Sequence, residues 1–119
     1  MALPNNHPLS ELVVHGYSSS LGATPVTAYM RAPTRGKIVE VGVIQNGAVT
    51  GTATVTTAVN GAAITGGALS VTAGGAGSLF SASPTQANDV NEGDVISFAP
   101  AGATGTVTGY CYAVIRKSA

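Results

Sequence analysis

Charged residues are scarce in this chain. Asp, Glu, Lys and Arg make up 8% of its 119 residues, five acids balancing five bases, whereas a soluble domain averages about 25% charged residues. Nucleic-acid recognition needs clustered Lys and Arg, so we exclude DNA and RNA as partners. Because the net charge is zero, copies of the chain repel one another only weakly. This favours a symmetric assembly in which neighbouring copies cover much of the surface. A stable monomer that meets water through Thr, Ser and backbone groups is the alternative.

Cysteine and long hydrophobic runs are also lacking. Cys111 is the single cysteine, which excludes a disulfide within the chain and suits synthesis in a reducing cytoplasm. We expect its side chain to be a small buried apolar group. No run of about 18 apolar residues occurs, so no membrane span is predicted. The segment from Met1 has neither the basic nor the apolar stretch of a secretory signal.

The residues of familiar catalytic and metal sites are missing. The two histidines are His7 and His15, and no Gly-x-Ser-x-Gly or Gly-x-x-x-x-Gly-Lys motif occurs, so neither a nucleophilic triad nor a phosphate loop is expected. The run from Asn88 to Asp94 could be a calcium loop, and Glu92 with Asp94 a carboxylate pair, but an ordinary acidic turn explains it better. We predict no enzyme and no catalytic, cofactor-binding or metal-binding residues, with His15 structural or exposed.

Small and β-branched residues dominate what is present. Ala, Gly, Thr and Val make up more than half of the chain, and they form short runs about ten residues apart, the spacing of an all-β sandwich or barrel. The strands that we predict, about eight in number, are Leu12 to Ser18, Pro25 to Arg31, Lys37 to Gln45, Thr50 to Val59, Ala68 to Thr72, Ser78 to Ser83, Asp94 to Ala99 and Thr106 to Arg116.

Several of these runs alternate with the period of two of a half-buried strand. In Thr50 to Val59, alternate threonines form a polar side opposite a mostly apolar side. In Thr106 to Arg116, Cys111 falls on the core side, while Tyr110 and Tyr112 fall on the other. The two tyrosines therefore point to solvent or into a neighbouring subunit.

Turn residues separate the runs. Asn46-Gly47 and Asn60-Gly61 favour tight hairpin turns, and Pro84 to Asn91 is the one segment with a plausible short helical turn. Pro4 and Pro8 make Met1 to Ser10 a poor start for regular structure. We predict an extended N-terminal arm over residues 1–10, followed by a single domain over 11–119. Its fold class is all-β, an antiparallel β-sandwich or jelly roll.

The stretch from Gly36 to Arg116 resembles small β-rich structural proteins of tailed bacteriophages. The features that carry the resemblance are GKIVEVGVIQNGAVTGTATVTTAVNG, ITGGALSVT, NEGDVISF and the closing strand YCYAVIR. The chain is similar to head decoration, or cement, proteins of the jelly-roll type. The resemblance implies a structural virion protein on the capsid exterior that binds the major capsid protein, commonly as a homotrimer, and stabilises the shell without a cofactor.

Such a role needs a segment that reaches the capsid and a surface for self-association. The candidate oligomer-interface residues are Tyr110 and Tyr112, although tyrosines that merely cap the sandwich edge are the alternative. A basic loop around Pro33 could dock on an acidic partner or simply face water. The candidate capsid-contact residues lie in the arm and in this loop, and are Leu3, Pro4, His7, Pro8, Arg31 and Arg35.

A different function fits the same sandwich. A receptor-binding or carbohydrate-binding jelly roll from a phage fibre or tail could use the outward-facing tyrosines to stack on sugars. The small number of aromatic residues, 5% of the chain, speaks against it.

Overall fold

The computed structural model describes residues 11–22, 25–47, 49–72, 75–104 and 107–117. This part of the chain forms strands joined by turns and loops, and none of its elements is a helix long and apolar enough to cross a membrane. The strands are β1 (Glu11–Ser18), β2 (Ala28–Arg31), β3 (Gly36–Gln45), β4 (Ala53–Val59), β5 (Ala62–Val71), β6 (Leu79–Ala82), β7 (Asp89–Val90), β8 (Val95–Ala101) and β9 (Gly109–Lys117).

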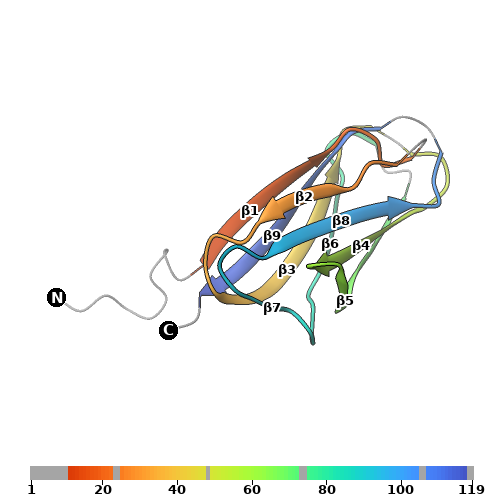
Figure 1. The fold of residues 1–119 in the computed structure, drawn as a ribbon. Helices are drawn as coiled ribbons and strands as arrows, with labels where there is room; N and C mark the ends of the chain where they lie inside the picture. The colour runs from red at the N-terminus through yellow and green to blue at the C-terminus, as the bar shows by residue number, and fades with distance from the viewer. Residues whose placement is uncertain (1–10, 23–24, 48, 73–74, 105–106, 118–119) are drawn as a thin grey trace.

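Two antiparallel sheets face each other (Figure 1). The first sheet has the strand order β1-β9-β3-β6, with the two-residue β7 pairing beside the start of β3, and the second has the order β2-β8-β4-β5. The chain passes from one sheet to the other at every connection except β4 to β5 and β6 to β7. A five-stranded and a four-stranded antiparallel sheet packed face to face form a β-sandwich of the jelly-roll kind, so the predicted fold class is confirmed.

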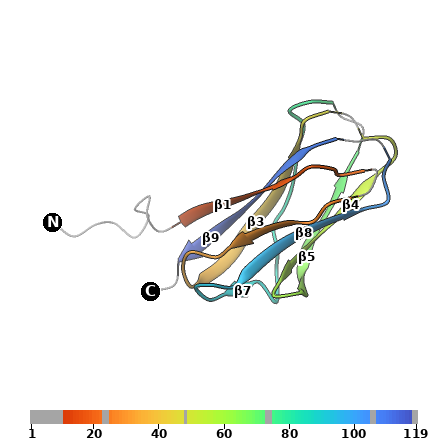
Figure 2. The same ribbon diagram turned by 45° about the horizontal axis from the view of Figure 1, so that its top comes forward.

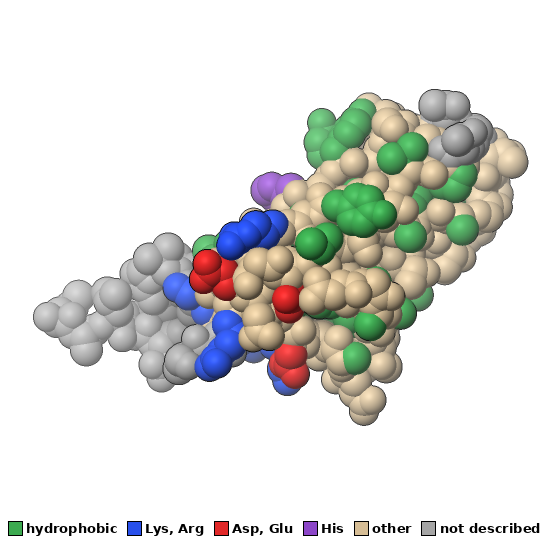
Figure 3. Space-filling view, viewed as in Figure 1, with side chains coloured by type: hydrophobic (Ala, Val, Ile, Leu, Met, Phe, Trp, Pro, Cys, Tyr) green, Lys and Arg blue, Asp and Glu red, His purple; other side chains and the backbone are tan. Residues whose placement is uncertain are grey.

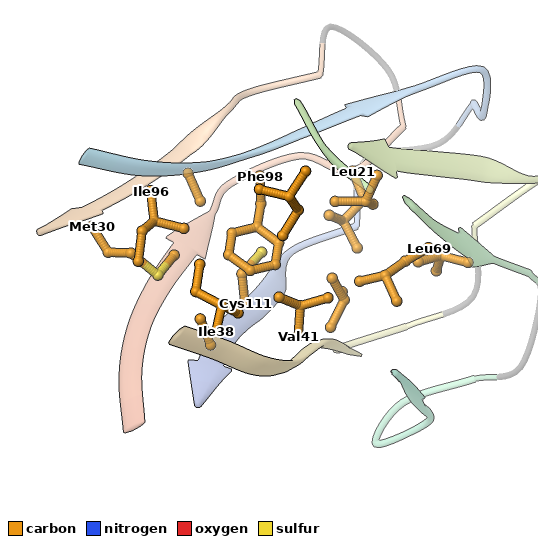
Figure 4. Packing of buried hydrophobic residues seen from close by; sticks show 14 of the residues in the cluster. Leu21, Met30, Ile38, Val41, Leu69, Ile96, Phe98 and Cys111 are labelled. Carbon is orange, nitrogen blue, oxygen red and sulfur yellow. The ribbon is translucent and has the colours of Figure 1, made fainter. Parts of the chain in front are cut away.

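The core lies between the sheets and consists mainly of aliphatic side chains. Phe98 of β8 is its largest fully buried residue, and Figure 4 shows the ring between the sheets near Cys111 of β9. Burying such a side chain contributes about 1.5–3 kcal/mol. The alternation read from the sequence is confirmed, because Ala53, Val55 and Thr57 are all fully buried. Cys111 is also buried, with 1% of its surface exposed.

The two Asn-Gly pairs have different roles. Asn60 and Gly61 join β4 to β5 with φ values of 51° and 88°, which is the backbone of a tight hairpin turn. Asn46-Gly47 does not close a hairpin, because β3 and β4 belong to different sheets. The prediction of a hairpin there is wrong, since local turn propensity cannot tell a reversal within one sheet from a crossing between two.

The predicted helical turn at Pro84 to Asn91 is also wrong. This segment instead links the edges of both sheets. The Thr65 amide of β5 donates to the Gln86 carbonyl, and Asn88 donates through Nδ2 to the Ile38 carbonyl of β3 at 2.6 Å. Ala87 between them has a φ of 56°, a conformation that non-glycine residues rarely adopt. Long-range hydrogen bonds thus outweigh local propensity here, and β7 follows where a helical turn was expected.

The start of β1, the end of β9 and β7 all lie at one end of the sandwich (Figure 2). The predicted arm over residues 1–10 lies outside the described residues, so its extended conformation stays a prediction.

Candidate binding surface

Four large apolar side chains form a row across the outer face of the first sheet. Tyr17 of β1 pairs with Tyr110 of β9, Tyr110 with Ile44 of β3, and Ile44 with Leu79 of β6. Residues paired across antiparallel strands point to the same side of a sheet. The exposed fractions are 51% for Tyr17, 56% for Tyr110, 38% for Ile44 and 55% for Leu79. We call these four residues the apolar row.

The two tyrosines of the apolar row touch each other. Their ring centroids are 5.2 Å apart and the ring planes are inclined by 59°, a tilted geometry that aromatic pairs favour. The rings therefore form an angled ridge rather than one flat plate. Ile44 and Leu79 extend this ridge across the remaining two strands with aliphatic groups.

Tyr112 lies in the next row, two residues further along β9. Its strand neighbours are His15, which is exposed, and Gly42. The Tyr112 ring occupies the space over Gly42, so that a Cβ atom there would collide with the ring. The Tyr112 hydroxyl donates a hydrogen bond of 2.5 Å to Oε2 of Glu40. Burial together with this carboxylate raises the pKa of Tyr112 to about 12.

A β-bulge in β3 makes this arrangement possible. The pairing with β9 shifts between Ile38 and Glu40, so that Ile38 faces the core opposite Ile115 while Glu40 faces outward opposite Val114. Strict alternation from Ile38 would have directed Glu40 inward. The bulge thus keeps a carboxylate out of the core and places it within reach of Tyr112.

The far end of the same face is charged. Glu11 of β1 pairs with Arg116 of β9, which pairs with Lys37 of β3, which pairs with Asp89 of β7. Oε2 of Glu11 accepts bonds from Nη2 and Nε of Arg116 at 2.7 and 3.0 Å. Nζ of Lys37 lies 3.8 Å from Oδ1 of Asp89. We call these four residues the charged row.

Nine of the ten charged residues of the chain follow this division, and the tenth, Glu40, lies in the middle of β3. The nine lie in the first residues of β1 and β3, the last residues of β2 and β9, β7, and the turns beside them. The four connections at the opposite end, residues 19–27, 46–52, 72–78 and 102–108, contain no Asp, Glu, Lys, Arg or His. On the face drawn in Figure 3, blue and red side chains gather at one end only. We refer to the charged end and the uncharged end, and the apolar row lies beside the uncharged end.

The structure places the predicted site residues at two separate locations. Tyr110 and Tyr112 share the outer face of the first sheet, but only Tyr110 is largely exposed. Arg31 and Arg35 are exposed at the charged end, where Nη2 of Arg31 lies 3.5 Å from Oε2 of Glu92. Leu3, Pro4, His7 and Pro8 lie outside the described residues. Capsid contact and an oligomer interface thus stay predictions for all of these residues.

The acidic segment from Asn88 to Asp94 is a turn whose carboxylates point to different partners. Asp89 faces Lys37 and Glu92 faces Arg31, while Oδ2 of Asp94 accepts a bond from the Asn91 amide at 2.8 Å. That backbone bond, with a smaller contribution from the Asn60 side chain, lowers the pKa of Asp94. Among the described residues, no group of three His, Cys, Asp or Glu side chains converges on a point where a metal could bind.

Comparison with known proteins bears on the fold alone. No family model and no curated protein matches the sequence. One similar structure is the catalytic unit of a thermostable GH87 α-1,3-glucanase from Streptomyces thermodiastaticus, with a TM-score of 0.54, 14% identity, and 92% of this chain and 26% of that chain covered. Another contains the CBM22-1 and GH10 modules of Clostridium thermocellum xylanase 10B complexed with xylohexaose, with a TM-score of 0.51, 16% identity, and 92% and 25% covered.

A third structure, described as "CBM4 structure and function", has a TM-score of 0.42 and 10% identity, with 91% of this chain and 93% of that chain covered. The chain spans about a quarter of the length of the first two structures. At identities of 14% and 16%, the similarity to the first two structures establishes a common β-sandwich fold and leaves the ligand open.

Sequence reasoning did not join Tyr17, Ile44 and Leu79 to Tyr110 as one surface. Each lies in a predicted strand, and its outward phase is visible from the alternation. The sequence does not show which strands are neighbours, and only that order joins the three residues to Tyr110.

Proposed function

We propose that this chain is a non-catalytic binding module that attaches to a larger assembly through defined outer surfaces. The observation that supports this proposal is the apolar row, in which four large side chains of one sheet face stay exposed beside an end without charges. A monomer gains nothing from leaving such groups in water, and exposed apolar patches commonly mark binding sites.

The first candidate for that assembly is a phage capsid, with the chain as a decoration protein. The sequence resemblance supports it, and the division of the surface suits it: the charged end, where β1 follows the arm, would face the capsid. Arg31 and Arg35 lie at that end. Ile44 and Leu79 also favour a protein partner, because aliphatic side chains pack against protein but offer a sugar no hydrogen bond.

The second candidate is receptor or carbohydrate binding, and the structural comparisons favour it over capsid decoration. The two structures with TM-scores above 0.5 belong to a glucanase and a xylanase, and the xylanase modules were complexed with xylohexaose. In this chain Tyr17, Tyr110 and Tyr112 share one sheet face with Glu40. Aromatic rings beside polar groups can bind a neutral sugar.

Two binding measurements on the full chain separate these candidates. The first adds purified protein to undecorated heads of the phage that encodes it and counts bound copies per capsid subunit. Capsid decoration predicts a plateau at a fixed ratio, lowered when residues 1–10 are deleted from a chain that still folds. The second titrates the protein with xylohexaose and with a neutral glucan oligosaccharide by calorimetry.

Saturable binding to heads without binding to sugars would establish the decoration role. Sugar binding that Tyr110→Ser abolishes, without binding to heads, would establish the second candidate instead. Failure of both measurements would contradict both candidates.

A further inference from the structure

We propose that the apolar row is a contact between copies of this chain. The inference rests on the proposed function, since it names the first partner of a binding module. It concerns the isolated protein, however, so it can fail or succeed independently of any capsid or sugar.

The exposed area of the apolar row supports an interface of moderate size. A whole tyrosine side chain presents about 200 Å², so the half-exposed Tyr17 and Tyr110 leave about 100 Å² each in water. With Ile44 and Leu79 the row exposes about 350 Å², the size of the largest apolar patch on a typical monomer, which is often functional. A stable interface buries about 800 Å² per partner. The row thus supplies nearly half, and the remainder can come from His15, Ser81 and the neighbouring uncharged loops.

The distribution of charge points to a second copy as the occupant. Neither the apolar row nor the four connections of the uncharged end contains a charged side chain, so two copies can meet there without repulsion. The first carboxylate along the face belongs to Glu40, which already accepts the Tyr112 hydrogen bond. A charged partner would leave its charges without a counterpart here, whereas a neutral copy of the same surface would not.

The charged row restricts how the copies meet. From β1 to β7 its charges are Glu11 negative, Arg116 positive, Lys37 positive and Asp89 negative. If the two faces overlapped completely with parallel strands, Glu11 would lie over the partner's Asp89 and Arg116 over the partner's Lys37. Like charges would then oppose each other. The copies avoid this when only their apolar rows overlap and their charged ends point in opposite directions.

The test is sedimentation velocity of the full chain over a range of concentrations from about 5 to 500 μM, which brackets a micromolar dissociation constant. We expect the mass to rise with concentration from 11.7 kDa toward that of a dimer. Tyr110→Ser should raise the dissociation constant at least tenfold, which corresponds to about 1.4 kcal/mol. Leu79→Ser, at the other end of the row, should do the same.

Tyr29→Ser is the matched control, because Tyr29 is 69% exposed on the outer face of the second sheet. It should change the dissociation constant less than twofold. Thermal melts of all three variants should stay within a few degrees of the parent chain, which separates loss of association from loss of folding. Sodium chloride at 1 M should not weaken the association, since screening acts only on charges.

A monomer at every concentration would overturn the proposal, as would equal effects of Tyr110→Ser and Tyr29→Ser. A trimer that Tyr110→Ser dissociates would support the apolar row as the interface and replace the two-copy arrangement. Tight binding of xylohexaose by a strictly monomeric chain would assign the row to sugar instead.

Discussion

The outer faces of the two sheets carry side chains of very different size. Across the first sheet, one row reads Tyr17, Tyr110, Ile44 and Leu79. Across the second sheet, a comparable row reads Tyr29, Ser97, Ala58 and Ala63. Both sheets pack the same kind of aliphatic core on their inner faces. The core of each sheet is therefore built from its inner face, and the proposed binding function would explain the large exposed groups outside the first sheet.

The two outer faces also differ in how closely their side chains pack against one another. On the first sheet, Tyr112 covers Gly42 and bonds to Glu40, so part of this outer face is packed almost like a core. On the second sheet, Ala68 and Thr56 pair across the strands and both are exposed. Substitutions at Gly42 and Tyr112 should consequently affect stability, while substitutions at exposed positions of the second face should not.

The largest effect on stability that we expect concerns Cys111, which lies on the inner side of β9. Burial raises the pKa of Cys111 from 9.0 to about 12, so the folded protein holds the thiol neutral where the unfolded chain ionises it. The resulting stability is complete below about pH 9 and is lost as the pH rises toward 12. The free energy of unfolding should fall by about 3 kcal/mol at pH 11.

Urea unfolding between pH 7 and pH 11 measures this loss. In Cys111→Ala the decrease should be smaller, and the part that remains should reflect Tyr112, whose pKa is also raised to about 12. An unchanged pH profile in Cys111→Ala would show that the thiol is not the source.

A side chain added beneath Tyr112 should have the next largest effect. Gly42→Val would displace the ring and strain the Glu40 bond, and we expect a loss of about 2 kcal/mol in the free energy of unfolding. The matched variant Ala68→Val, on the exposed face of β5, should stay within about 0.5 kcal/mol of the parent. Chemical denaturation of both variants measures the difference. Equal losses would mean that the two outer faces are packed alike.

The smallest effect concerns one hydrogen bond. Tyr112→Phe keeps the ring over Gly42 but removes the donor to Glu40, which should cost about 1 kcal/mol. Tyr29→Phe on the second face should change stability by less than about 0.5 kcal/mol. Denaturation at pH 7 compares the two. If Tyr112→Phe leaves the free energy of unfolding unchanged, water replaces the tyrosine hydroxyl as the donor to Glu40. This part of the first face is then more accessible to solvent than its geometry indicates.

Much of the fold could be predicted from local patterns. The strand that contains Cys111 was recognised with the correct inward and outward phase, and the Asn60-Gly61 hairpin lies where its turn residues predict it. Predicted strand ends were less accurate: β2 begins at Ala28 rather than Pro25, and β5 begins at Ala62 rather than Ala68. The residues at strand ends depend on pairing with distant partners, which a local pattern does not contain.

The candidate surface was only half visible in the sequence. Tyr110 was identified because its own strand reveals its phase, whereas its neighbours Tyr17 and Ile44 come from strands far away in the chain. The environment of Gln45 could not be predicted from its local sequence either. Gln45 ends a predicted strand, yet it is fully buried, and neither of its amide atoms has a hydrogen-bond partner among the described residues.

The sequence by itself determined the all-β class and the sides of β4 and β9 that face the core, because the alternation of side chains is a property of the extended backbone. It also determined that charges are few. The tertiary structure decided that these charges gather at one end, that a bulge turns Glu40 outward, and that Tyr17, Tyr110, Ile44 and Leu79 form one row. These features depend on strand order and register, which arise from contacts between residues far apart in the chain.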